Sequence, residues 1–396
     1  MTALDPRSTV DATCPVCGGS RAEDVLSLPA LPILMNAQVR PEEAPDVPRG
    51  DIDLVVCLGC GHLFNRSFDP GLLDYDVTYE NTLHFSEQFR QYARALAERL
   101  VATHDLVGGT VAELGSGPGH FLSLLCEAGV GEGLGFDPSH DAGRFGAPDH
   151  ESVRVSSAAF PVDGSLHVDL ALSQHVLEHL GDPVAALAAQ RAAVAPRGGA
   201  VYTEVPNGQF MLEKCALWDL IYEHVSYFVP TSLELACRLA GLDVSVMGSE
   251  FGDQFLWCEA QAEGSVSTEV DAQQVERAVL SARSFGDAAR RRLSDARDEL
   301  VELGAAGPVA LWGAGSKGMT YLNLVGDSSM IAAVIDLNPR KAGFGVPGTS
   351  LVISDPSTLA GRRVSTVLVS NPIYVSEIEQ QLADLGIVTD VRPLWE

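Results

Sequence analysis

Four of the eight cysteines stand in two pairs that have the spacing of metal ligands. The pairs are CPVC, with Cys14 and Cys17, and CLGC, with Cys57 and Cys60. Each Cys-x-x-Cys turn directs two thiolates at one ion, and two such turns complete a tetrahedral sulfur site that favours zinc. A redox pair or scattered surface cysteines would not explain two matched pairs. We therefore expect one structural zinc and, because four thiolates leave no open position, no catalysis at the metal.

Two glycine-rich turns each follow an apolar run, and an acid follows each of them about twenty residues later. The first turn, AELGSGPGHF, spans 112–121 and precedes Asp137; the second, LWGAGSKG, spans 311–318 and precedes Asp336. Glycine lets the backbone pass close to a ligand, and an acid at the end of the next strand can accept hydrogen bonds from a ribose diol. Each turn is thus a candidate nucleoside site, and the motif alone would also fit a nicotinamide dinucleotide.

The segment WDLIYEHVSYF, residues 218–228, places Tyr222, Glu223 and His224 among apolar and aromatic neighbours. A histidine of near-neutral pKa can remove a proton from carbon, and a nearby hydroxyl can donate a hydrogen bond to the developing oxyanion. We expect these three residues to be catalytic, with Glu223 holding or polarising one of the other two. The alternative is that all three are buried polar groups that tie a helix to a strand.

A second histidine motif, HVLEH at 175–179, matches the His-x-x-Glu-His pattern of zinc peptidases. The motif follows the apolar strand VDLALSQ, and no separate third ligand presents itself in the sequence. We therefore reject the zinc-peptidase interpretation. Packing and capping roles are expected for Glu178 and His179.

The composition is that of a globular protein of two or three domains. Of its 396 residues 46% are apolar, and 26 Lys and Arg against 53 Asp and Glu give a net charge of −27. This charge would repel a phosphate backbone, so nucleic acid and anionic membranes are poor partners. The N-terminus lacks the pattern of a signal peptide, and no apolar run approaches the ~18 residues of a membrane span. We expect a cytoplasmic protein that acts on a small molecule.

Hydrophobic periodicity divides the chain into four parts. We expect a zinc-binding module over 1–75, an α/β core over 76–265, a long connecting helix over 266–303 and a C-terminal α/β domain over 304–396. In the core, apolar runs alternate with helical stretches, which favours a parallel sheet with helices on both faces. Apolar residues at steps of three and four over 271–303 predict the long helix, interrupted only by Gly286.

The first glycine turn and its surroundings resemble the class I S-adenosylmethionine-dependent methyltransferases over residues 105–210. The resemblance implies a Rossmann-like fold in which the turn holds the methionine portion of the cofactor and the acid after the next strand holds its ribose. Carried onto this sequence, the implied cofactor-binding residues are Glu113, Gly115, Gly117, Asp137, Gln174 and His175.

The whole arrangement resembles the three-part, zinc-containing sugar C-methyltransferases of nucleotide-linked deoxysugar biosynthesis. In that family a Tyr-Asp-Glu-His segment lies beside the substrate, and its histidine is the proposed base that removes a proton next to a 4-keto group. His224 and Glu223 match the Glu-His pair, which places Tyr222 at the aspartate and Ile221 at the tyrosine. Either the segment is one residue shorter and Tyr222 takes the role of the tyrosine, or that role is missing.

The second glycine turn then has two interpretations. Amide groups at a helix N-terminus bind anions, so the turn, with Ser316 and Lys317, can hold the diphosphate of the substrate or orient the C-terminal domain over the active site. Asn371, at the end of another strand, is a second substrate-binding candidate. Alternatively, the turn is only a tight connection retained from a dinucleotide-binding ancestor.

The expected function is C-methylation of a nucleotide-linked keto-deoxysugar in secondary metabolism, such as antibiotic biosynthesis. One alternative is O- or N-methylation of another polar metabolite, favoured if Tyr222 does not replace the tyrosine of the family. Another is a non-catalytic, zinc-containing nucleotide-binding protein.

Overall fold

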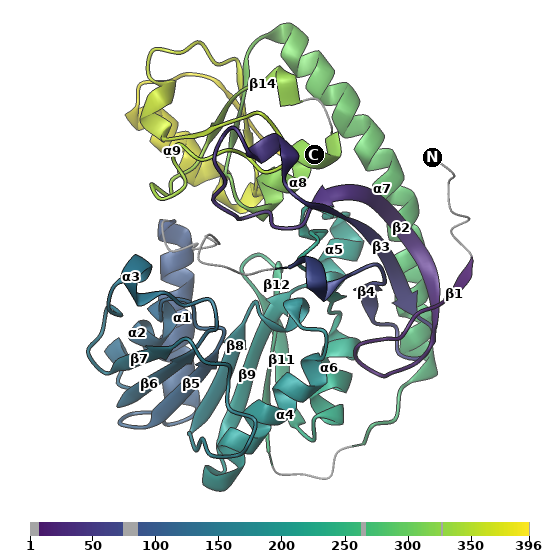
Figure 1. Ribbon diagram of the computed structural model, residues 1–396, viewed down its shortest axis with the longest axis vertical. Coiled ribbons are helices and arrows are strands. Elements are labelled where there is room, and N and C mark those ends of the chain that lie inside the picture. Colours follow the sequence, from purple (N-terminus) through teal and green to yellow (C-terminus); the bar gives the residue numbers. More distant parts are fainter. Residues whose placement is uncertain (1–7, 74–85, 263–266, 326–327, 396) are drawn as a thin grey trace.

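The computed structural model describes residues 8–73, 86–262, 267–325 and 328–395. Three β-sheets follow one another along the chain, and the long helix α7 (Ala272–Ala306) runs past the first sheet to the third (Figure 1). Among the described residues, none of the helices combines the length and the apolar character needed to cross a lipid bilayer. The predicted boundary between residues 75 and 76 and the one at residue 265 lie outside the described residues.

The N-terminal sheet is antiparallel and takes its last strand from a distant part of the chain. Its order is β1-β2-β3-β4-β10, with bounds Thr9–Asp11, Arg21–Pro32, Arg49–Cys57, Leu63–Asn65 and Ser226–Tyr227. Strand β10 pairs with β4, Tyr227 opposite Leu63, although β10 follows the WDLIYEH segment. The N-terminal module therefore completes its sheet with residues of the core, which fixes it beside His224.

The central sheet has the strand order β11-β12-β9-β8-β5-β6-β7. The strand bounds are β5 Thr110–Leu114, β6 Glu132–Phe136, β7 Val153–Ser156, β8 Leu170–Gln174, β9 Ala200–Pro206, β11 Asp243–Glu250 and β12 Phe255–Gln261. Strands β5 to β9 are parallel, as expected, whereas β12 is antiparallel to both of its neighbours. A tight hairpin joins it to β11, so it must run the opposite way. The order confirms the class I methyltransferase fold.

Helices cover both faces of this sheet (Figure 1). They are α1 Glu87–Thr103, α2 His120–Glu127, α3 Ala142–Phe145, α4 Pro183–Val194, α5 Gly208–Lys214 and α6 Pro230–Leu239. Helix α2 begins directly after the first glycine turn, where Gly119 has a φ of 84°. Because a left-handed φ favours glycine, this position keeps the turn tight before the helix.

The C-terminal sheet is fully parallel, with the order β15-β14-β13-β16-β17. Its elements are β13 Val309–Trp312, α8 Ser316–Val325, β14 Ile331–Ile335, β15 Ile353–Ser354, β16 Thr366–Val369, α9 Val375–Asp384 and β17 Asp390–Pro393. The second glycine turn lies between the central strand β13 and α8. The strand order changes direction between β13 and β16, so these two strands form the topological switch point of the sheet. Ligands of open α/β sheets bind at such a point.

Helix α7 connects the N-terminal sheet to the C-terminal domain through one apolar core, which includes Ile52, Phe285 and Leu322. The Arg283 guanidinium donates two hydrogen bonds of 2.6 Å to the buried carboxylate of Glu23 on β2. Gly286 allows β2 to approach, because a Cβ there would lie 2.4 Å from the Val25 carbonyl oxygen. The glycine that interrupts the helical pattern in the sequence is therefore a packing requirement.

Gly286→Ala should destabilise the protein even though alanine favours a helix by about 1 kcal/mol. The added Cβ collides with backbone, so β2 or α7 must shift at a cost of about 1–3 kcal/mol. Thermal and urea unfolding midpoints measure this effect. Gly304→Ala on the same helix is the matched control, because the nearest atoms to its Cβ belong to the flexible side chain of Met330, the closest at 3.3 Å. An unchanged midpoint in Gly286→Ala would contradict the close approach.

Candidate functional site

The two cysteine turns meet in space with the geometry of a four-sulfur site. The Sγ atoms of Cys14 and Cys60 are 3.7 Å apart, and those of Cys17 and Cys57 are 3.6 Å apart. All four sulfur atoms lie within 4.8 Å of one another. Zinc–sulfur bonds of about 2.3 Å give tetrahedral edges of about 3.8 Å, so the cluster is compatible with zinc.

Backbone groups and a buried histidine support this cluster. The amides of Gly19 and Gly59 donate to the sulfur atoms of Cys17 and Cys57, which stabilises thiolate charge. The ring of His62, two residues after Cys60, lies within hydrogen-bond distance of the hydroxyls of Ser226 and Ser232 in the core. The end of the module that carries the cysteine cluster is thereby tied to the segment that follows His224.

In the first glycine turn, backbone amides hold the carboxylate of Asp137. The Gly117 amide donates to Asp137 Oδ2 at 2.8 Å, and Asp137 Oδ1 accepts from the Ser139 amide. A Cβ on Gly117 would have no atom within 4 Å, so there is open space over the turn. Nearby, Glu113 is buried, its Oε2 atom has no hydrogen-bond partner among the described residues, and burial raises its pKa to about 8. This turn offers both room and unsatisfied polar groups to a ligand.

The second turn repeats the same hydrogen bonds. The Gly313 amide donates to the Ile335 carbonyl and the Ala314 amide to Asp336 Oδ2, at 2.7 Å in each case. In the first turn, Gly115 and Gly117 make the equivalent bonds. Local geometry therefore does not distinguish the turns, and their surroundings must decide which ligand each one binds.

Gln174 and His175 lie at the carboxyl end of β8 and face the buried carboxylate of Glu204 on β9. The Gln174 amide donates to Glu204 Oε1, and His175 Nε2 lies 3.3 Å from the same oxygen. Burial opposes a charge on His175, but Glu204 and Glu178 outweigh it and raise the pKa of the ring. The hydroxyls of Tyr92 and Tyr202 also donate to Glu204. Gln174 and His175 thus belong to a hydrogen-bond and ion-pair network centred on Glu204, which no motif in the sequence indicates.

His224 is held in one tautomer. Its Nδ1 atom lies 3.0 Å from the Asp219 carbonyl oxygen, which only accepts, so Nδ1 carries the proton and Nε2 presents a lone pair. Burial lowers the pKa of the ring well below its ordinary value. The ring of His179 lies 4.9 Å away, and its Nδ1 atom donates to the Glu223 carbonyl. The structure therefore joins two histidine motifs that are far apart in the sequence.

Glu178 completes this cluster. Both of its carboxyl oxygens are buried without a hydrogen-bond partner among the described residues, and burial raises its pKa to about 7. Glu178, His179 and His224 each have one potential ligand atom within 4.8 Å of those of the other two. His224 is therefore the third potential metal ligand, which the sequence around HVLEH did not reveal. The helical spacing of a zinc peptidase is absent here, because His175 has a φ of 54° and residues 177–179 form a 3-10 helix.

Glu223 and Tyr222 point to the N-terminal module. Glu223 Oε1 accepts from the Met35 amide at 2.9 Å, and burial raises the pKa of this carboxyl to about 8. The Tyr222 hydroxyl accepts from the Asp69 amide at 2.9 Å, and its ring stacks on Phe68. Glu223 therefore holds the segment 218–224 against the loop at Met35, and the Tyr222 hydroxyl has a partner outside the histidine cluster.

The second turn reaches the same segment through Lys317. Its Nζ atom donates to Asp219 Oδ1 at 3.3 Å and lies over the ring of Trp218. Asn371 exchanges two side-chain hydrogen bonds with Gln254, of 3.0 and 3.1 Å, and Ser316 is partly exposed at the start of α8. Lys317 thus brings the C-terminal domain to within contact of the residues around His224.

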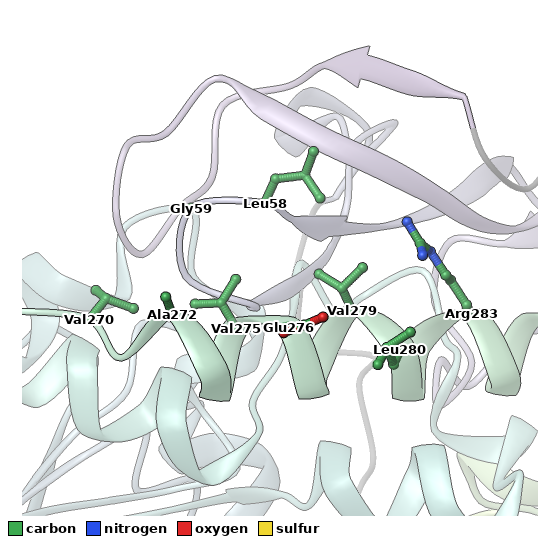
Figure 2. A pocket seen from close by; sticks show the side chains of 9 residues that line it. All are labelled: Leu58, Gly59, Val270, Ala272, Val275, Glu276, Val279, Leu280 and Arg283. Atoms are coloured by element: carbon green, nitrogen blue, oxygen red, sulfur yellow. The ribbon is translucent and has the colours of Figure 1, made fainter.

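A surface pocket of about 460 Å³ lies elsewhere, between the CLGC turn and α7. Figure 2 shows Leu58 above Val275 and Val279 of the helix. None of the predicted catalytic or cofactor-binding residues lines this pocket.

Comparison with known proteins assigns the middle and C-terminal parts of the chain. Residues 84–245 match the family described as methyltransferase domain, and residues 260–387 match the family described as C-methyltransferase C-terminal domain. These two domains define the class of the protein as a methyltransferase. The more specific resemblance to C-methyltransferases is supported by the second match.

Curated relatives match over shorter stretches. A methyltransferase of Mycobacterium tuberculosis is 35% identical over 99 residues, which are 23% of this chain and 38% of that protein. One of Mycobacterium ulcerans is 37% identical over 84 residues, 20% of this chain and 32% of that protein. The matches therefore span about a third of the length of these relatives.

Among solved structures, 1,6-didemethyltoxoflavin-N1-methyltransferase of Burkholderia thailandensis aligns with a TM-score of 0.34 and 19% identity, over 43% of this chain and 77% of that chain. An S-adenosylmethionine-dependent methyltransferase of Clostridium acetobutylicum aligns with a TM-score of 0.36 and 10% identity, over 44% and 92% of the two chains.

The purified protein should contain one zinc per chain. Cys57→Ser should lose the metal and lower the thermal midpoint, because metal binding contributes folding free energy to such modules. Elemental analysis and thermal unfolding measure both, and Cys215→Ser, at a buried cysteine outside the cluster, is the control. A zinc content well below one ion per chain would contradict the site. A second zinc ion per chain would point to binding at the Glu178 cluster.

S-Adenosylmethionine should bind at the first turn. Asp137→Ala should weaken its binding by about 1–3 kcal/mol, because the ribose loses a charged acceptor. Asp336→Ala removes the equivalent acid of the second turn and should leave the affinity nearly unchanged. Calorimetry compares the two variants, and the opposite ranking would exchange the assignments of the turns.

Proposed function

We propose that the protein is an S-adenosylmethionine-dependent methyltransferase that C-methylates a nucleotide-linked keto-deoxysugar through an enolate, in secondary metabolism. The observation that carries this proposal is the buried His224, fixed as its Nδ1–H tautomer beside His179 and Glu178. A neutral imidazole with one available lone pair is the form that a general base requires.

The cofactor would be held by the first turn and the neighbouring strand ends. Open space over Gly117 and the unsatisfied Glu113 fit a ligand there, and Asp137 keeps lone pairs available for a ribose diol. Gln174 and His175 follow at the next strand end. Bound S-adenosylmethionine supplies an activated methyl group, so the protein has to orient the acceptor, exclude water and manage one proton.

In the proposed reaction, His224 Nε2 removes the proton from the carbon next to the ketone. The lowered pKa keeps the ring neutral at neutral pH, so Nε2 retains the lone pair that a base needs. The oxyanion that develops needs a donor. Lys317, partly buried beside Asp219 and Trp218, supplies a cation at this segment, whereas the Tyr222 hydroxyl accepts from the Asp69 amide on the side of the N-terminal module. Glu223 acts as a positioning residue, since its carboxyl fixes the segment on the Met35 amide.

The position of Tyr222 keeps a second candidate open. If no tyrosine serves the oxyanion, O- or N-methylation of another polar metabolite becomes the alternative. The position of the label in a product formed with labelled S-adenosylmethionine decides between carbon and a heteroatom. No transfer to any of a panel of nucleotide sugars would favour the non-catalytic, nucleotide-binding alternative.

His224→Asn should reduce turnover about 100- to 10,000-fold while S-adenosylmethionine affinity stays near that of the wild type. The asparagine amide can replace the Nδ1–H bond to Asp219, so the loss would report the missing base and not a displaced segment. With a keto-sugar, solvent deuterium should exchange into the carbon next to the ketone in the wild type and not in the variant.

The control is Tyr222→Phe, which removes the bond from the Asp69 amide and should cost about 1 kcal/mol of stability with a much smaller loss of turnover. Full activity of His224→Asn would return the histidine to a structural role. Lost activity with intact exchange would place the base elsewhere.

A further inference from the structure

The HVLEH motif and the segment before β10 bring together three groups that can each donate a lone pair to a metal ion. Glu178 and His179 lie in the 3-10 helix Leu177–His179, and His224 lies close to the start of β10. One potential ligand atom of each residue lies within 4.8 Å of those of the other two. Two imidazoles and one carboxylate can hold zinc or iron(II) and leave further coordination positions open.

The two histidines are held in the same tautomer. Nδ1 of His179 donates to the Glu223 carbonyl and Nδ1 of His224 to the Asp219 carbonyl, at 3.0 Å in each case. Since a carbonyl oxygen only accepts, Nε2 carries the lone pair in both rings. Histidine ligands of metals characteristically donate their other N–H group to a backbone carbonyl or a carboxylate. A general base needs one ring held in this way, whereas a metal site explains why two rings are.

Glu178 lacks the partners that a buried carboxylate requires. Its side chain is 1% exposed, and neither carboxyl oxygen has a hydrogen-bond partner within the described ranges. Oε1 lies 3.8 Å from His175 Nδ1 and 3.9 Å from His179 Nε2, which is too far for a hydrogen bond. Buried carboxylates are normally paired, hydrogen-bonded or bound to a metal. A cation beside the histidines would supply the missing partner.

We propose that Glu178, His179 and His224 form a site for a second divalent transition-metal ion, distinct from the cysteine cluster, with zinc as the expected ion. Imidazole nitrogen suits zinc, nickel and iron, whereas magnesium and calcium prefer oxygen ligands alone. A bound ion would occupy the Nε2 lone pair of His224, so the metal and the substrate proton would compete for one atom. Zinc is therefore expected to inhibit methyl transfer, and this consequence rests on the proposed function.

A purely structural cluster is the competing explanation. Burial raises the pKa of Glu178 to about 7, so its carboxyl could also stay protonated. The O–H group of a neutral carboxyl would nevertheless need an acceptor, and the described part of the chain provides none. The test must therefore detect the metal itself and identify its ligands.

The experiment titrates the full-length protein, with one equivalent of zinc already in its cysteine site, with Zn²⁺ and with Co²⁺. Competition with a chromophoric chelator measures zinc affinity, and visible absorption reports the ligands of cobalt. We expect one further ion per chain and a cobalt spectrum typical of nitrogen and oxygen ligands. The thiolate-to-metal charge-transfer band that the cysteine cluster would give should be absent, and millimolar Mg²⁺ should not displace the ion.

Glu178→Gln and His224→Asn should each weaken binding of the further zinc ion at least about ten-fold, because even groups that only support a metal ligand contribute about 10- to 100-fold to affinity. Glu113→Gln is the matched control, since it also removes a buried carboxyl with an unpaired oxygen, but at the first glycine turn. Thermal unfolding without added metal checks that the variants fold, and His179→Asn replaces either variant that does not.

The site would be overturned if the wild type took up no further ion at millimolar concentration, if both ligand variants kept wild-type affinity, or if cobalt showed the thiolate band. Zinc should also suppress methyl transfer and deuterium exchange in the wild type, and a chelator should restore both. Metal binding without inhibition would overturn the competition at His224, as would a metal requirement for transfer. The proposed function fails separately, if no methyl is transferred with or without metal.

Discussion

The pairing of β10 with β4 is the contact on which the arrangement of the site depends. It attaches Ser226 and Tyr227, which follow one residue after His224, to the sheet of the cysteine module. The Glu223 carboxyl and the Met35 amide secure the same segment from a second direction, and Lys317 contacts Asp219 from a third. A histidine must be held in one orientation to act as a base. These contacts can fix the position of the His224 ring better than a flexible loop would.

Burial of acids and bases together gives the site its electrostatic character. Glu113, Glu178 and Glu223 are buried, and desolvation raises the pKa of each, while the pKa values of His179 and His224 are lowered. Low dielectric surroundings thus favour neutral forms on both sides. A proton could then move between neighbouring groups without leaving a strongly charged side chain in the core, as the proposed reaction through an enolate would require.

The two glycine turns have the same local design in different surroundings. Each places an acid under the backbone with the same bonds, yet the first is flanked by Glu113 and the second by Lys341 and Lys317. An acidic neighbour favours cationic or hydroxyl groups, whereas the lysines favour anions. A chain with a net charge of −27 repels anions at long range, so the two lysines beside the second turn would confer local selectivity.

The sequence by itself determined the class of fold, the cysteine pairs and both glycine turns, because these depend on local spacing and on backbone conformations that few residues adopt. It also singled out His224, whose polar neighbours stand out in an apolar segment. It could not predict the antiparallel β12, the pairing of β10 with β4 of the N-terminal sheet, or the contact of His179 with His224. These follow from contacts between segments far apart in the chain. Nor could it show that Tyr222 faces Asp69. Tertiary packing decided these placements, because the identity of a side chain fixes which bonds it can make, while only the fold determines which partners come within reach.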